Sequence, residues 1–199
     1  MTRRSGWTVS ALADAYLAGG ARFIQVRSKQ AGSATFLSMC EDVVARARKI
    51  GAIVIVNDRA DIARLSAADG VHVGQDDLDP ASARRILGGS AVIGISTHSQ
   101  DQVRAAATMA VDYIAVGPVF GTLTKDTGHS DVGTAFVSEA AALLRQAGCV
   151  KPIVAIGGIT LERAADVIRA GAASVAVISD LLSTGDPEAR TREYLRVLS

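Results

Sequence analysis

Two β-branched runs that end in acidic residues decide the fold: Ile53–Arg59, which reads IVIVNDR, and Gly70–Asp77, which reads GVHVGQDD. Four consecutive Val and Ile residues are typical of a strand buried on both faces, as in a parallel sheet. The segment 60–68 between the two runs has the length of one short helix. The sequence therefore predicts strand, helix, strand, with Asp58 and Asp77 at the carboxyl ends of neighbouring strands.

These two carboxylates point to a divalent metal. In α/β folds the carboxyl ends of the strands are where the chemistry takes place. Two carboxylates that converge there suit Mg²⁺, which proteins hold through one or two carboxylates together with substrate phosphates. Each residue alone is also explained by a turn, because Asp and Asn commonly cap helices. The paired placement of Asp58 and Asp77 favours the metal site.

The composition excludes several classes of function. At 199 residues, the chain fits one domain spanning 1–199. The balance of 21 Lys+Arg against 20 Asp+Glu predicts no nucleic-acid partner and no binding to anionic membranes. We expect no membrane span, because no apolar run approaches roughly 18–20 residues, and no signal peptide. Cys40 and Cys149 lack metal-ligand spacing, which favours buried thiols in a reducing compartment, the cytoplasm.

Strand-like runs alternate with helix-like segments along the chain, which predicts a parallel sheet built from repeated βα units. The seven expected strands are 23–27, 53–56, 71–73, 92–95, 113–116, 153–156 and 174–178. The expected helices are 8–18, 34–49, 60–68, 80–87, 100–109, 134–147, 161–170 and 187–198. A closed (β/α)₈ barrel has eight strands. We therefore expect a TIM barrel that lacks its first strand, the one that would precede helix 8–18.

The first expected strand ends in polar residues that share one face. Side chains alternate along a strand, so Gln25, Arg27 and Lys29 point to the same side. Two cations and an amide at a strand end suit a phosphate or a pyrophosphate. The alternative is a charged loop whose side chains form surface ion pairs.

The fourth expected strand is followed by a run of hydroxyl residues. Ser96 lies nearest the strand end and is the better candidate for contact with a phosphate oxygen, whereas Thr97 and Ser99 fit a role as helix caps. His98 fits the start of the next helix better than the role of a catalytic base.

Two later loops carry further anion-binding features. Thr122, Thr124 and Lys125 offer two hydroxyls and a cation after the strand 113–116. Gly158 lets backbone N–H groups approach a phosphate at the start of the next helix, and Ser179 follows the last strand. Phosphate binding by the last loops is a recurrent feature of TIM barrels. The site therefore suits two phosphorylated small molecules, one of them a pyrophosphate ester bound to Mg²⁺.

Taken together, these motifs resemble the thiamine-phosphate synthase family. The segments that carry the resemblance are QVRSK at 25–29, NDR at 57–59, GQDD at 74–77, GISTH at 94–98, GPVFGTLTK at 117–125 and GGI at 157–159. The resemblance implies Mg²⁺-dependent condensation of 4-amino-5-hydroxymethyl-2-methylpyrimidine pyrophosphate with 4-methyl-5-(2-phosphoethyl)thiazole, which yields thiamine phosphate and pyrophosphate. The residues that it assigns to the pyrimidine pyrophosphate are Gln25, Arg27, Lys29, Asn57, Ser96 and Lys125.

The same resemblance divides the remaining roles. It assigns Mg²⁺ to Asp58 and Asp77, and catalysis to Arg27, Lys29, Ser96 and Lys125. The residues that it assigns to the thiazole phosphate are Thr122, Thr124, Gly158, Ile178 and Ser179.

Two other functions fit the same scaffold. A thiazole tautomerase would need no Mg²⁺ and would use an acid/base residue such as His98, but it would not need both Asp77 and the Thr122–Lys125 motif. A non-catalytic paralogue that binds phosphorylated ligands is the second alternative. The sheet edge left by the absent strand makes a homodimer a hypothesis as well.

Overall fold

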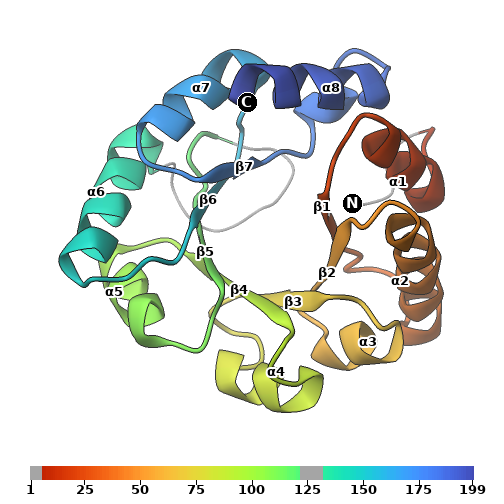
Figure 1. Ribbon diagram of the computed structural model, residues 1–199, viewed down its shortest axis with the longest axis horizontal. Coiled ribbons are helices and arrows are strands. Elements are labelled where there is room, and N and C mark those ends of the chain that lie inside the picture. Colours follow the sequence, from red (N-terminus) through yellow and green to blue (C-terminus); the bar gives the residue numbers. More distant parts are fainter. Residues whose placement is uncertain (1–5, 122–131) are drawn as a thin grey trace.

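The computed structural model describes residues 6–121 and 132–199, where strands and helices alternate around a ring (Figure 1). The strands are β1 (Phe23–Val26), β2 (Ile53–Asn57), β3 (Gly70–Val73), β4 (Val92–Thr97), β5 (Tyr113–Val116), β6 (Ile153–Ile156) and β7 (Ser174–Ala176). The helices are α1 (Val9–Ala18), α2 (Ser33–Arg48), α3 (Ala60–Leu65), α4 (Pro80–Leu87), α5 (Gln100–Thr108), α6 (Gly133–Gln146), α7 (Leu161–Arg169), the short η1 (Asp180–Leu182) and α8 (Pro187–Leu198). Among these helices, none has both the length and the apolar character needed to cross a membrane.

The sheet is parallel throughout, and its strand order follows the chain from β1 to β7. Within the described residues β1 and β7 do not pair with each other, so the expected TIM-barrel-like sheet with an open first position is confirmed. The outer layer of helices nevertheless closes, because α1 packs against α8. Gly19 follows α1 so near to α8 that a Cβ atom there would lie 2.7 Å from Cβ of Thr191.

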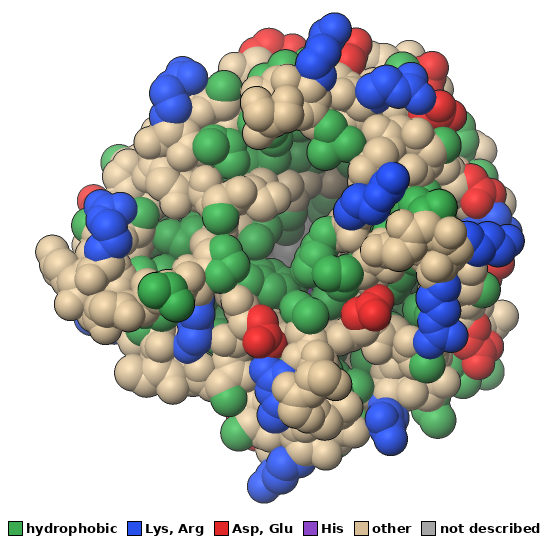
Figure 2. Space-filling model, in the orientation of Figure 1, with side chains coloured by type: hydrophobic (Ala, Val, Ile, Leu, Met, Phe, Trp, Pro, Cys, Tyr) green, Lys and Arg blue, Asp and Glu red, His purple; other side chains and the backbone are tan. Residues whose placement is uncertain are grey.

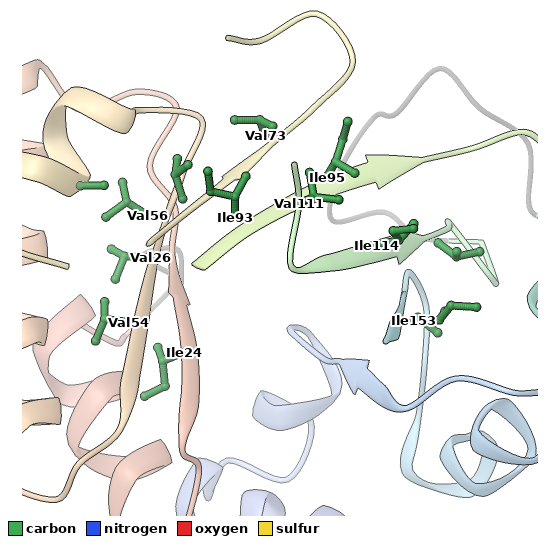
Figure 3. Close-up of a cluster of buried hydrophobic side chains, with 14 of the residues drawn as sticks. Ile24, Val26, Val54, Val56, Val73, Ile93, Ile95, Val111, Ile114 and Ile153 are labelled. Carbon is green, nitrogen blue, oxygen red and sulfur yellow. The ribbon is translucent and has the colours of Figure 1, made fainter. Parts of the chain in front are cut away.

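The hydrophobic core lies between the sheet and the helices. Alternate strand residues are buried in this core, and Figure 3 draws a cluster of them that includes Ile24, Val26, Val54, Val56, Val73, Ile93, Ile95, Ile114 and Ile153. Burying one such side chain contributes about 1.5–3 kcal/mol. Because β-branched side chains fit a pleated surface covered on both sides, these runs form the strands that the sequence predicted.

The other set of strand residues faces the inside of the barrel. Phe23 of β1 meets Tyr113 of β5 edge to face, with ring centroids 5.7 Å apart, although these two strands are not neighbours in the sheet. Phe23 and Ile53, at the first positions of β1 and β2, are 47% and 36% exposed. The face viewed down the ring is hollowed at its centre and lined there by hydrophobic side chains (Figure 2). Apolar side chains are thus open to solvent at the amino-terminal ends of β1 and β2, whereas Tyr113 and His72 further inside are buried.

Several local predictions were wrong, and among them the helix expected over 60–68 ends at Leu65. The last strand ends at Ala176 rather than at residue 178, because the chain turns towards η1. Thr97 is the last residue of β4 and not a helix cap: its buried hydroxyl donates to the Ala115 carbonyl at 2.9 Å, whereas Ser99 does cap α5. Cys40 is buried in α2 as expected, but Cys149 is half-buried and follows α6.

Candidate functional site

The backbone places Asp58 and Asp77 at the carboxyl ends of β2 and β3. Asp58 has a φ angle of 64°, in the left-handed region that residues other than glycine seldom adopt. Its N–H donates to the His72 carbonyl of β3 at 2.8 Å, which ties the turn to the neighbouring strand. The Asp77 carboxylate accepts a hydrogen bond from the Gly74 N–H at 2.7 Å. The backbone of Asp58 and the side chain of Asp77 are therefore held by local contacts at the same edge of the sheet.

The two carboxyl groups meet. The pKa of Asp58 is raised, first by burial and then by a hydrogen bond with Asp77 and by the negative charge of that residue. The positive charges of Lys29 and Arg27 act on that pKa in the opposite direction. The structure thus brings the two predicted metal ligands together, with Lys29 and Arg27 near enough for their charges to act on Asp58. The roles of these four residues in binding stay a prediction.

The donor set at this edge fits Mg²⁺. Two carboxylates that compete for one proton suit a small divalent cation, because the cation neutralises the charge that they share. In the described part of the chain, no group of three or more His, Cys, Asp or Glu side chains is arranged to hold a metal ion. A cation at Asp58 and Asp77 would therefore complete its shell with substrate oxygens and water, which is how Mg²⁺ is usually bound.

Gln25 and Asn57 lie on the inner side of the barrel. Gln25 belongs to β1 and hydrogen-bonds the hydroxyl of Tyr113. Asn57 ends β2 in register with His72 of β3, and it is half-buried. The alternation that grouped Gln25 with Arg27 is consistent with these positions. The Ser28 hydroxyl, beyond the end of β1, accepts a hydrogen bond from the Ala31 N–H at 3.3 Å.

Ser96 is held from two directions at the end of β4. Its Oγ lies 2.8 Å from Nε2 of His72, and its backbone carbonyl accepts a hydrogen bond from the Gln75 amide at 2.6 Å. The side chain is half-buried at the carboxyl end of the sheet, where the sequence predicted a contact with phosphate. The structure places Ser96 on the side of the sheet that carries His72.

Sequence reasoning missed His72 and Tyr113. Both are buried inside the barrel, and Nδ1 of His72 lies 2.9 Å from the Tyr113 hydroxyl. The available signal was the alternation in β3, where His72 stands between Val71 and Val73: two outward apolar residues imply an inward polar one. Tyr113 carried no such signal, because a tyrosine at the start of a strand is also an ordinary core residue.

The glycines of the second predicted anion region have a packing role. Gly157 and Gly158 both have positive φ angles, 103° and 58°. A Cβ atom on Gly158 would lie 2.5 Å from the Gly121 carbonyl oxygen, and one on Gly157 would lie 2.6 Å from Cα of Pro118. The loop after β6 therefore lies directly against the loop after β5, and this contact requires glycine whether or not phosphate binds.

Ile178 and Ser179 lie between β7 and η1, and an unpredicted cluster fixes this segment. The Tyr194 hydroxyl of α8 lies 2.7 Å from Oδ2 of Asp180 and 3.3 Å from the Ile159 carbonyl. Arg190 of α8 also pairs with Asp180, at 2.9 Å. One tyrosine thus links the loop after β6, which contains Gly158, to the loop after β7.

Comparison with known proteins matches this sequence to one family. The family model described as thiamine monophosphate synthase matches residues 2–181. The chain belongs to this family. The curated thiamine-phosphate synthase of Chlorobium luteolum is 42% identical over 92% of this chain and 84% of its own length. That of Thermus thermophilus is 41% identical over 96% of this chain and 91% of its own length.

A solved structure supports the same assignment. The thiamine phosphate pyrophosphorylase from Pyrococcus furiosus superposes on this chain with a TM-score of 0.88 and 28% sequence identity. The match covers 99% of this chain and 92% of that chain. The thiamine monophosphate synthase family is therefore shown by sequence and by fold, and the resemblance seen in the motifs is confirmed.

The Thr122–Lys125 motif and His98 are the last predicted residues to be placed. Thr122, Thr124 and Lys125 lie outside the described residues. His98 is the acid/base candidate for a tautomerase. Its ring nitrogen Nδ1 forms a hydrogen bond with the Gly117 carbonyl, and its backbone N–H donates to Oε1 of Gln102 at 2.7 Å. These contacts agree with the predicted position of His98 at the start of a helix.

Proposed function

We propose that the protein is a thiamine-phosphate synthase. It would join 4-amino-5-hydroxymethyl-2-methylpyrimidine pyrophosphate to 4-methyl-5-(2-phosphoethyl)thiazole, forming thiamine phosphate and pyrophosphate. The observation that carries the proposal is the meeting of Asp58 and Asp77 within the electrostatic reach of Lys29 and Arg27. Membership of the family and the similarity to relatives named for this activity support it.

Asp58 and Asp77 would hold the Mg²⁺ that this reaction requires. When bound, the cation neutralises negative charge on the pyrophosphate. The two carboxylates would present their oxygens at the carboxyl ends of β2 and β3, where a bond from the Gly74 N–H fixes the Asp77 carboxylate and a backbone bond to His72 fixes the turn at Asp58. Their burial and mutual repulsion make the pair a poor place for two negative charges alone, which favours a cation there.

The basic residues would stabilise the leaving group. When the bond between the pyrimidine methylene and the pyrophosphate oxygen breaks, the electron pair leaves with pyrophosphate, and the aminopyrimidine ring stabilises the resulting carbocation. Arg27, Lys29 and Lys125 would balance the charge that develops on the departing oxygen, and Ser96 would donate a hydrogen bond to it. No protein nucleophile is needed, because the thiazole nitrogen captures the cation and forms the new C–N bond.

The remaining residues would position the two reactants. Gln25 and Asn57 lie on the inner side of the barrel, where an amide can both donate to and accept from the pyrimidine ring. By the resemblance to the family, the residues that would bind the thiazole phosphate are Thr122, Thr124, Gly158, Ile178 and Ser179. Holding the thiazole nitrogen in line with the methylene carbon supplies the orientation part of the rate enhancement.

Turnover with matched variants tests the proposal. The wild-type protein should form thiamine phosphate from the two substrates when Mg²⁺ is present and lose this activity when the metal is chelated. Asp58→Asn and Asp77→Asn should each lower turnover by about 10²-fold or more. Asp166→Asn is the matched control, because Asp166 is an exposed residue near the end of α7. Isomerisation of a thiazole without metal would instead support a tautomerase, and binding without either reaction would support a non-catalytic paralogue.

Location and assembly belong to the same proposal. Cys40 and Cys149 are free thiols, which suits the reducing conditions of the cytoplasm. Within residues 6–121 and 132–199 the outer edges of β1 and β7 have no strand partner, which makes homodimer formation a hypothesis that sedimentation of the purified protein at micromolar concentration would decide.

A further inference from the structure

Four side chains from four strands form a hydrogen-bonded chain across the inside of the barrel. Gln25 of β1 bonds to the Tyr113 hydroxyl of β5, which lies 2.9 Å from Nδ1 of His72 in β3. Nε2 of His72 in turn lies 2.8 Å from Oγ of Ser96 in β4. His72 and Tyr113 are only 8% and 6% exposed, so water competes little for these bonds. The chain leads from the barrel interior to a half-buried hydroxyl at the carboxyl end of the sheet.

Packing fixes the two rings at the centre of this chain. The rings of His72 and Tyr113 are stacked, with centroids 5.5 Å apart and an angle of 25° between their planes. Phe23 contacts Tyr113 from another side, edge to face. A Cβ atom on Gly94 would overlap the Tyr113 ring, so the glycine is what allows this ring to lie against β4. Because the rings are held by neighbours, the hydrogen-bonding atoms are set in place before any ligand binds.

The hydrogen bonds of this side-chain network can donate in only two alternative directions. A neutral imidazole carries one proton, so one ring nitrogen donates and the other accepts. If Nε2 carries the proton, His72 donates to Ser96, and the Ser96 hydroxyl can donate towards the carboxyl end of the sheet. If Nδ1 carries it, Ser96 donates to His72 and presents only lone pairs to a ligand.

Two observations favour the direction that ends in a donor at Ser96. Of the two hydroxyls that flank the His72 ring, the phenol of Tyr113 is in general the better donor, because a phenol is a stronger acid than the aliphatic hydroxyl of Ser96, and it lies 2.9 Å from Nδ1. Tyr113 then has its own proton available for Nδ1 of His72. Arg27 and Lys29 also lie near this end of the barrel, where they attract an anion, and an anion is stabilised by an O–H donor rather than by lone pairs.

We propose that His72, in its Nε2–H tautomer, is a positioning residue that orients the Ser96 hydroxyl as a hydrogen-bond donor to a phosphate oxygen of the leaving group. His72 acts through Ser96 and does not itself touch the substrate. Tyr113, held by Gln25, sets the tautomer because its hydroxyl donates a hydrogen bond to Nδ1 of His72, which leaves the ring proton on Nε2. The identity of the anion rests on the proposed function, whereas the tautomer does not.

The tautomer can be observed directly. In protein labelled with ¹⁵N-histidine, long-range proton–nitrogen correlations distinguish the protonated ring nitrogen from the bare one, and the His72→Gln variant identifies the signals of His72. We expect Nε2 to carry the proton near pH 7.5. A protonated Nδ1, or two protonated nitrogens, would overturn the proposal even if the enzyme is active.

A double-mutant cycle tests whether His72 acts through Ser96. His72→Leu should lower kcat/KM for the pyrimidine pyrophosphate by about 10- to 100-fold, the value of one hydrogen bond to a charged group. The KM for the thiazole phosphate should be unchanged, and His72→Gln, which keeps an amide donor, should recover part of the loss. In a Ser96→Ala background, His72→Leu should cause little further loss. Additive losses from the two substitutions would refute the coupling.

Further variants separate this role from folding and from the proposed function. Tyr113→Phe removes the donor to His72 with a small change of volume and should cost about 2- to 10-fold in kcat/KM. Tyr16→Phe is the matched control, since Tyr16 is equally buried but lies on α1. If the wild-type protein forms no thiamine phosphate, the proposed function fails, and the same cycle is measured on binding of Mg²⁺ and inorganic pyrophosphate. Equal affinities of wild type and His72→Leu in that measurement would refute the positioning role.

Discussion

Replacing Tyr194 by phenylalanine tests the cluster that links the two last loops of the barrel. The Tyr194 hydroxyl lies 2.7 Å from Oδ2 of Asp180 and 3.3 Å from the Ile159 carbonyl. A single hydroxyl proton serves one acceptor at a time, and the shorter contact to the charged carboxylate is the dominant one. Burial, the hydrogen bond to Asp180 and the charge of Asp180 all raise the pKa of Tyr194, so the hydroxyl keeps its proton at neutral pH.

The expected loss of stability follows from what remains after the substitution. A hydrogen bond to a charged group contributes about 1.5–3 kcal/mol. Asp180 would still be paired with Arg190, whose guanidinium approaches the same carboxylate at 2.9 Å, so the carboxylate would not be left unsatisfied. The cost should therefore lie at the lower end, about 1.5 kcal/mol, which corresponds to a fall in Tm of about 3–6 °C for a protein of this size.

Thermal unfolding and steady-state kinetics of Tyr194→Phe measure the two consequences. Because Tyr194 holds the loops after β6 and β7 together, the KM for the thiazole phosphate should rise several-fold, while the KM for the pyrimidine pyrophosphate should stay within about twofold. Tyr16→Phe controls for loss of a buried tyrosine hydroxyl elsewhere. An unchanged Tm would show that the Asp180 contact contributes nothing, and equal rises in both KM values would show that the cluster does not serve one subsite.

Three further predictions concern other parts of the chain. Because the pKa of Asp58 is raised, the folded state binds this proton more tightly than the unfolded chain does. The metal-free protein should therefore lose stability as the pH rises above the ordinary Asp pKa of 3.8 and through the pKa of the folded state. Urea titrations across pH measure this loss, and Asp77→Asn should reduce it. Burial raises the pKa of the Cys40 thiol to about 12, so a thiol reagent should modify Cys149 in the native protein and Cys40 only after unfolding; equal native rates would contradict the burial. Gly94→Ala should cost about 1–3 kcal/mol or more through overpacking, and an unchanged free energy of unfolding would show that the barrel interior is looser than described.

The fold was predictable because its signals are local. The run Ile53–Val56 is too apolar for a strand with an exposed face, and the Asp58 and Asp77 that follow β2 and β3 mark the carboxyl ends of parallel strands. The meeting of those carboxylates followed from topology alone, since neighbouring parallel strands end at the same edge of a sheet. The fine boundaries did not follow, because Thr97 extends β4 through a hydrogen bond to another strand.

The contacts across the barrel were out of reach of sequence reasoning. His72 and Tyr113 are far apart in the chain and meet only because the curved sheet brings β3 and β5 together. Tyr194 is similar, since its partners lie in two separate segments, Ile159 in the loop after β6 and Asp180 at the start of η1. Gly158 shows the opposite problem: its position predicted a phosphate contact, but the structure reveals that a neighbouring loop already requires glycine there.

Calorimetric titration of Mg²⁺ in the presence of inorganic pyrophosphate tests the central claim most directly. If Asp58 and Asp77 hold the cation while Arg27 and Lys29 hold the anion, the wild-type protein and Asp166→Asn should bind the pair with equal affinity. Asp58→Asn and Asp77→Asn should each weaken that binding at least about tenfold, because one of two carboxylate ligands is lost. Binding that survives both substitutions unchanged would contradict the account.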